Sequence, residues 1–113
     1  DPSSLINKMS GTEFSFILPK GWLSSTGALY RQGKMRLTTG EDELAVQRDS
    51  RVQENSGYGV FVLLARVVTE IGELTAVKPE ELEQLFLPDF VYLQSFYNRV
   101  NQYQGEFLSS GEL

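Results

Sequence analysis

The first part of the chain alternates apolar and polar residues with the period of a β-strand. Phe14, Phe16 and Leu18 recur at every second position, and this spacing predicts a half-buried strand over residues 13–18. Pro19 has no backbone N–H to donate to a neighbouring strand. We therefore expect the strand to end there and a turn to follow.

A second pair of short apolar stretches predicts a β-hairpin. The two arms cover residues 28–31 and 34–38, with Gln32 and Gly33 between them. Glycine readily adopts the positive φ that a tight turn requires. We expect the turn at this dipeptide, and hence a small antiparallel sheet.

After residue 38 the apolar residues change to the spacing of amphipathic helices. Thr38 or Thr39 can cap a short helix that ends near residue 48. The apolar positions over 58–71 predict the main buried helix, and Pro79 and Pro88 predict the starts of two more, because proline is favoured at the first helical position. The expected fold is α+β: a β-hairpin or three-stranded antiparallel sheet at the N-terminus, followed by a bundle of about four helices.

Length and composition indicate a single domain. The chain has 113 residues, of which 41% are hydrophobic, which is enough for one modest core. We expect this domain over residues 13–103. Residues 1–12 and 104–113 are polar, and we expect a flexible N-terminal arm and a flexible C-terminal tail there.

The absence of cysteine and histidine narrows the possible chemistry. Zinc and iron–sulfur sites draw mainly on these two residues, and a Ser-His or Cys-His nucleophilic pair cannot be built. A hydrolase that uses carboxylates alone needs two of them opposed across a pocket, for which a small helical domain has little room. We therefore expect no enzyme activity, no catalytic residues, no metal, no cofactor and no small-molecule substrate.

The net charge is −5 and is unevenly distributed. Residues 1–51 carry seven basic and six acidic side chains, whereas residues 52–113 carry three basic and nine acidic ones. An acidic chain without a basic stripe binds nucleic acid poorly, so we expect no nucleic-acid partner. The polarity either serves solubility or orients docking onto a protein partner. No stretch approaches the roughly 18 apolar residues of a membrane span, so we expect no membrane insertion.

Two polar or glycine-rich motifs have simple structural explanations. The acidic triplet at 41–43 could bind a divalent cation, but the dipole at a helix N-terminus also favours carboxylates and explains it fully. Gly57-Tyr58-Gly59 lacks the preceding strand and the third glycine of a phosphate-binding loop, so it more simply marks a helix entry.

Large aromatic and basic side chains are the candidates for partner binding. We expect Trp22 and Leu23 on a loop, where Trp22 either covers the core or contacts a partner. Arg66 interrupts the most apolar helix, so it forms an internal ion pair, extends its charged end to the surface, or reaches a partner's carboxylate. The full set of candidates is Trp22, Leu23, Arg31, Arg36, Arg66 and Tyr92.

Several short motifs over residues 14–103 resemble one protein family. They are LPKGW at 18–22, G-x-L-x-R-x-G at 27–33, MRL at 35–37 followed by Thr39, Asp42 and Glu43, RD-x-RV-x-x-N at 48–55, and LLARVVT-x-I-G at 63–72. This pattern resembles small proteins of phage-tail-like contractile injection systems, encoded beside sheath, tube and baseplate genes. These are similar to tail-assembly or baseplate-assembly proteins of contractile-tailed phages.

The resemblance implies a non-enzymatic role. The protein is then an assembly factor or a minor structural component whose partners are protein subunits of a tail, baseplate or sheath assembly. Its expected location is the bacterial cytoplasm, free or in an assembled particle. The alternative from another class is a small free-standing helical adaptor or regulatory binding module.

Overall fold

The computed structural model describes the backbone of residues 13–112 and the side chains of residues 13–101. The expected arm at residues 1–12 lies outside the described residues. The elements in chain order are β1 (Glu13–Leu23), β2 (Leu29–Arg36), α2 (Gly40–Arg48), α3 (Ser50–Glu54), the 3-10 helix η1 (Ser56–Tyr58), α4 (Gly59–Val67), β3 (Val68–Ile71), α5 (Pro79–Leu82) and α6 (Leu87–Glu112).

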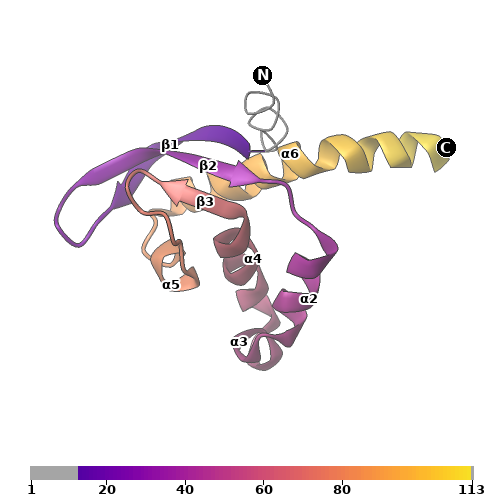
Figure 1. Ribbon diagram of the computed structural model, residues 1–113, viewed down its shortest axis with the longest axis horizontal. Coiled ribbons are helices and arrows are strands. Elements are labelled where there is room, and N and C mark those ends of the chain that lie inside the picture. The colour runs from indigo at the N-terminus through magenta and orange to yellow at the C-terminus, as the bar shows by residue number, and fades with distance from the viewer. Residues whose placement is uncertain (1–12, 113) are drawn as a thin grey trace, which may run out of the picture.

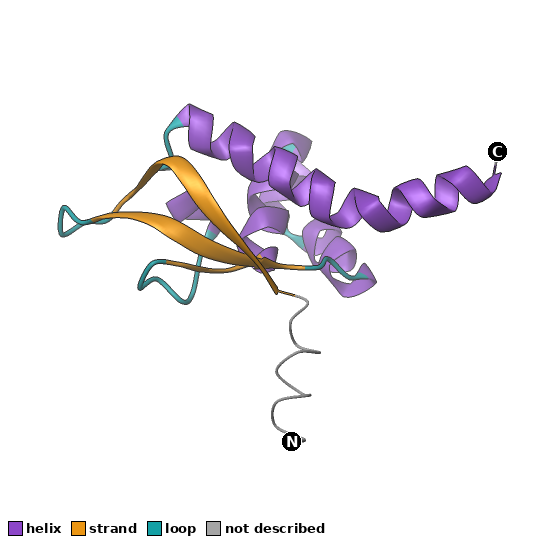
Figure 2. Cartoon of the chain, turned by 90° about the horizontal axis from the view of Figure 1, so that it is seen from above, coloured by secondary structure: helices purple, strands orange, loops and turns teal. Residues whose placement is uncertain are grey.

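The strands form one antiparallel sheet in the order β1-β2-β3. Figure 1 shows α4 leading up to β3 with α2 and α3 beside it, while α6 runs past the sheet. Figure 2 shows the same helix continuing beyond the rest of the described chain. The expected α+β class is confirmed.

The hydrophobic core lies between the sheet and the helices. Phe16 contacts Phe96 of α6 edge to face, with 5.6 Å between ring centroids, and Phe61 of α4 stacks on Phe90 at 4.6 Å. The core side chains that are almost completely buried are Phe16, Leu18, Met35, Leu64, Val67, Val68, Ile71, Leu82 and Leu93. No helix within the described residues has both the length and the apolar composition needed to cross a bilayer.

The predicted turn at Gln32 and Gly33 is wrong, because both residues lie inside the continuous strand β2. The hairpin turn lies earlier, where Ser24 N–H donates to the carbonyl of Ala28 at 2.8 Å. Gly33 serves packing instead of turning. A side chain there would clash with the ring of Phe16, its partner across β1 and β2.

The expected end of the first strand at Pro19 is also wrong. β1 continues to Leu23, but its register changes between Ile17, which lies opposite Gln32, and Trp22, which lies opposite Tyr30. Residues 18–21 between them form a bulge opposite a single residue of β2, Arg31. A strand tolerates proline at a bulge because no ladder hydrogen bond is lost there.

The prediction of one helix over 58–71 is wrong, because the segment divides among three elements. η1 and α4 account for its first part, and β3 begins at Val68. Val68, Thr69 and Ile71 are β-branched, which favours extended backbone, and β3 pairs with β2 through Gly33 and Ile71. The third strand of the sheet therefore comes from the middle of the chain.

The helix starts were predicted more accurately. Thr39 is the N-cap of α2 in a capping box with Asp42, and α5 begins at Pro79. α6 begins at Leu87, one residue before the expected start. Its backbone stays helical to Glu112, past the tail boundary at residue 104, and the flexibility of that segment stays a prediction.

The burial of Leu64 gives a direct test of this core. Its side chain is 1% exposed in the middle of α4. Leu64→Ala removes buried methyl groups and leaves a cavity, so we expect a loss of about 2–5 kcal/mol in the free energy of unfolding. Urea titration followed by circular dichroism measures it. A loss below about 1 kcal/mol would contradict the position of α4 in the core.

Candidate protein-binding surface

The structure separates the six candidate residues into two regions. Arg36 and Arg66 meet at a buried carboxylate that joins the sheet to α2 and α4. The others lie along β1, along β2 and on the first turns of α6, near the β1 bulge. The six residues therefore do not form one continuous site.

The first region is centred on Asp42, whose side chain is 1% exposed. Arg36 donates to both carboxylate oxygens through Nη1 and Nη2, at 2.9 and 2.8 Å. Arg66 donates through Nε at 2.8 Å, and the backbone N–H of Thr39 donates at 2.8 Å. One carboxylate thus holds β2, the N-terminus of α2 and α4 together.

The electrostatics of this centre follow from its hydrogen bonds. The guanidinium of Arg36, then that of Arg66, holds the pKa of Asp42 well below its usual range, although burial acts in the opposite direction. A carboxyl group whose pKa is lowered by folding stabilises the protein above its unfolded-state pKa of about 4. That stability is lost as the pH falls below this value. Of the alternatives expected for Arg66, the structure shows the internal ion pair, with Asp42 as the partner.

Asp42→Asn should make the protein less stable and less sensitive to acid. The amide keeps the size of the side chain but leaves two guanidinium groups without their counter-charge, so we expect a loss of about 3 kcal/mol at neutral pH. Between pH 5 and 2 the stability of the original protein should fall more steeply than that of the variant. Urea unfolding across this pH range measures both effects, and parallel pH profiles would contradict the assignment.

The second region depends on another buried carboxylate, that of Asp89 in the first turn of α6. Its two oxygens accept the backbone N–H groups of Lys20 and Gly21 at 2.7 and 2.8 Å. Gly21 has a φ of 113°, a conformation that favours glycine. Asp89 therefore satisfies the donors that the β1 bulge turns away from β2.

Arg31 and Tyr92 complete the same arrangement. Arg31 is the single residue of β2 opposite the bulge, and its Nε donates to the carbonyl of Leu18 at 2.8 Å. The hydroxyl of Tyr92 accepts the N–H of Ile17 at 3.3 Å. Both predicted binding residues thus stabilise β1, and Arg31 remains an exposed residue.

Trp22 lies in β1, so the expected loop position of Trp22 and Leu23 is wrong. The indole is half-buried, stacks on Tyr30 with 6.3 Å between ring centroids, and packs against the core. Its Nε1 is buried and has no hydrogen-bond partner within the described residues. These contacts correspond to the core-covering alternative.

Trp22→Ala should therefore affect stability first. Removing the ring exposes core atoms and the face of Tyr30, so we expect a loss of about 3 kcal/mol in the free energy of unfolding. Trp22→Phe is the matched control, because it keeps an aromatic ring and removes the unpaired N–H; its loss should be clearly smaller. A Trp22→Ala protein within about 1 kcal/mol of the original would show that the indole is dispensable for packing.

Leu23 lies directly opposite Leu29 next to the hairpin turn. These leucines are 51% and 54% exposed, and they point to the opposite side from Trp22 and Tyr30, because successive residues of a strand alternate. Leu29 and Arg31 both lie beside Gly21, within about 3 Å of where a Cβ would stand. We call the four exposed residues Lys20, Leu23, Leu29 and Arg31 the hairpin surface.

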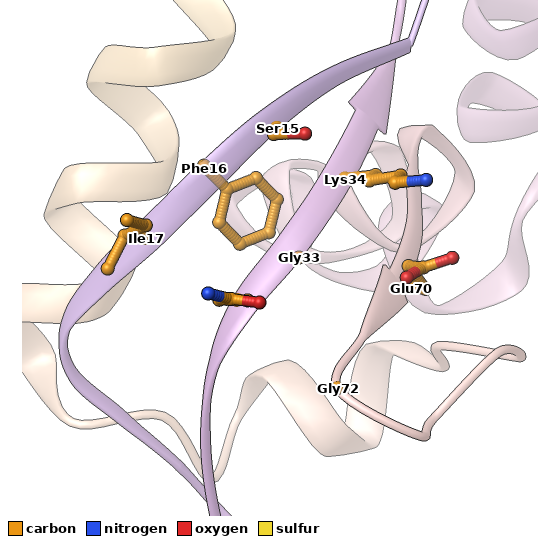
Figure 3. Close-up of a pocket in the computed structure, with 8 residues that line it drawn as sticks. Ser15, Phe16, Ile17, Gly33, Lys34, Glu70 and Gly72 are labelled. Carbon is orange, nitrogen blue, oxygen red and sulfur yellow. The ribbon is translucent and has the colours of Figure 1, made fainter.

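Three pockets on the protein surface differ from the hairpin surface in the residues that line them. One of about 300 Å³ lies on the sheet between Ile17 and Glu70, and Figure 3 shows Lys34 and Glu70 pointing the same way from its edge, with Gly33 leaving room beside the ring of Phe16. Another, of about 230 Å³, lies between α2, α4 and α6. The third, of about 370 Å³, is lined by polar side chains around Arg51. None combines exposed leucines with charges of one sign.

The two residues that organise these regions, Asp42 and Asp89, are not predicted as site residues from the sequence. For Asp42 the sequence predicts a helix-dipole role or, within the acidic triplet, a divalent cation, and it gives Asp89 no role in a site. Position gave a partial signal for Asp89, because an acidic residue follows Pro88 at a helix start. Nothing local indicates that its partners are Lys20 and Gly21, which are nearly seventy residues away. Leu29 lies in the first arm of the predicted hairpin, and its exposure is set by the tertiary fold.

Comparisons with known proteins give no match: no protein-family profile fits the chain, and neither curated proteins nor solved structures resemble it significantly. Among the side chains that the structure describes, no group of three or more His, Cys, Asp or Glu is placed to hold a metal ion. The predictions of no metal and no cofactor remain predictions.

Proposed function

We propose that this protein is a non-enzymatic assembly factor or minor structural component of a phage-tail-like contractile injection system. It acts through contacts with protein subunits of the tail, baseplate or sheath. The proposal starts from the motifs over residues 14–103, which resemble small proteins of such systems.

One observation carries most weight in its support. Arg36 and Asp42 belong to one stretch of the resembling pattern and Arg66 to another, and the three residues meet at one buried ion-pair centre. The two stretches therefore serve one structural centre in this chain. This convergence supports treating them as parts of one pattern.

The hairpin surface supports action through protein contacts. It presents two exposed leucines on a strand pair that the bulge contacts hold in place. Exposed apolar side chains on a fixed framework suit protein recognition, because little conformational entropy is lost on binding. We assign the contact with the assembly to this surface.

Co-elution with purified tube, sheath and baseplate proteins tests the function and the surface together. We expect the protein to form a complex with at least one of them, and the double variant Leu23→Ser/Leu29→Ser to weaken it by about 2 kcal/mol or more. Leu44→Ser on α2 is the matched control, because Leu44 is similarly exposed, at 48%, outside the hairpin. It should leave the complex intact.

The possible outcomes are distinct. Failure to bind any of the three classes of subunit contradicts the proposed function and favours a free-standing adaptor. A complex that both leucine variants weaken equally supports the function but removes the hairpin surface from the interface. Circular dichroism of each variant establishes that it is folded.

A further inference from the structure

We propose that the hairpin surface binds an acidic protein segment that carries apolar side chains. This inference rests on the proposed function in that it takes the hairpin surface as the binding surface, and it adds the chemistry of the partner. The argument uses the charge of the hairpin, the position of its leucines and the rigidity of its framework.

The β1–β2 hairpin is basic within an acidic protein. Residues 13–36 contain four basic side chains and one acidic one, whereas the chain as a whole carries a net charge of −5. Arg36 is engaged by Asp42. Lys20, Arg31 and Lys34 are exposed, and none of them forms an ion pair with the side chains that the structure describes. Lys34 lies opposite Glu70 of β3, so the charges available to a partner of the hairpin surface are those of Lys20 and Arg31.

The basic and apolar groups are close enough to contact one partner segment. Leu29 and Arg31 lie side by side against Gly21, and Leu23 is paired with Leu29 across the strands. Lys20 is the neighbour of Gly21 in the bulge. An occupant that covers the two leucines therefore faces the charge of Arg31 directly, with the exposed Lys20 on the adjoining bulge. Carboxylates beside apolar side chains match this pattern, because charge complementarity selects the partner and sets its orientation.

The same charges disfavour the other occupants. A symmetric dimer that joined two hairpin surfaces would place Lys20 and Arg31 of one copy against the same residues of the other. Nucleic acid would satisfy the positive charges but leave the leucines uncovered. An acidic protein segment satisfies both kinds of group.

The framework keeps the surface in one shape before binding. Asp89 fixes the backbone of Lys20 and Gly21, and Arg31 Nε fixes the carbonyl of Leu18. The Nε bond leaves the terminal nitrogens of Arg31, Nη1 and Nη2, without an acceptor among the described residues. Because the surface already has one shape in the free protein, little binding free energy is spent on ordering it.

The test uses a short synthetic peptide with two leucines flanked by glutamates, titrated into the full chain and followed by amide NMR shifts. The expected result is saturable shifts at Leu23, Leu29 and Arg31, with affinity that falls as salt rises. A peptide with lysines in place of the glutamates should not bind. Shifts confined to other parts of the protein, or equal binding of both peptides, would overturn the proposal.

Variants separate charge from apolar contact. Lys20→Glu should weaken peptide binding about threefold to tenfold, because it reverses one exposed charge, and Leu29→Ser about tenfold. Lys78→Glu, which reverses a lysine outside the hairpin, and Leu44→Ser are the matched controls and should leave binding unchanged. Self-association that Leu29→Ser abolishes, or binding of duplex DNA that Lys20→Glu abolishes, would overturn the proposal by identifying a different occupant.

The same variants distinguish this inference from the proposed function. If a tail, sheath or baseplate protein binds regardless of salt and of Lys20→Glu, the inference fails and the proposed function stands. If the acidic peptide binds at the hairpin surface but no subunit of such a system does, the proposed function fails and the inference stands.

Discussion

The arrangement of the sheet and helices depends on the hydrogen bonds and ion pairs of the buried Asp42 carboxylate. It accepts hydrogen bonds from Arg36 on β2, from Arg66 on α4 and from Thr39 at the start of α2. A carboxylate removed from water is stable only when its charge and its lone pairs are satisfied. These three elements must therefore come together in one geometry, which sets how the helices lie against the sheet.

A second buried carboxylate, that of Asp89, positions the part of the molecule to which we assign binding. It connects the first turn of α6 to the bulge of β1 through Lys20 and Gly21. The bulge changes the register of β1 against β2, so Trp22 packs with Tyr30 while Leu23 and its partner across the strands remain exposed. The same carboxylate thus stabilises the fold and positions the hairpin surface.

The hairpin and the helical part of the chain differ in charge and in exposed apolar surface. The helices carry most of the negative charge and share the core with the sheet, while the hairpin supplies positive charge and exposed leucines. Protein recognition needs no titratable nucleophile or metal, only a surface held in place with complementary charge and apolar area. On the hairpin surface, Lys20 supplies the charge and Leu29 the apolar area.

The sequence by itself determined the α+β class and the helix starts, because caps and first-turn prolines act within a few residues, as at Thr39 and Pro79. It did not determine the hairpin register. Gly33 has the local signal of a turn but is required where Phe16 crosses it, and Pro19 has the signal of a strand end but lies in a bulge held by Asp89. Only the tertiary structure decides such positions, because the competing interaction comes from a distant residue whose contribution exceeds the local preference.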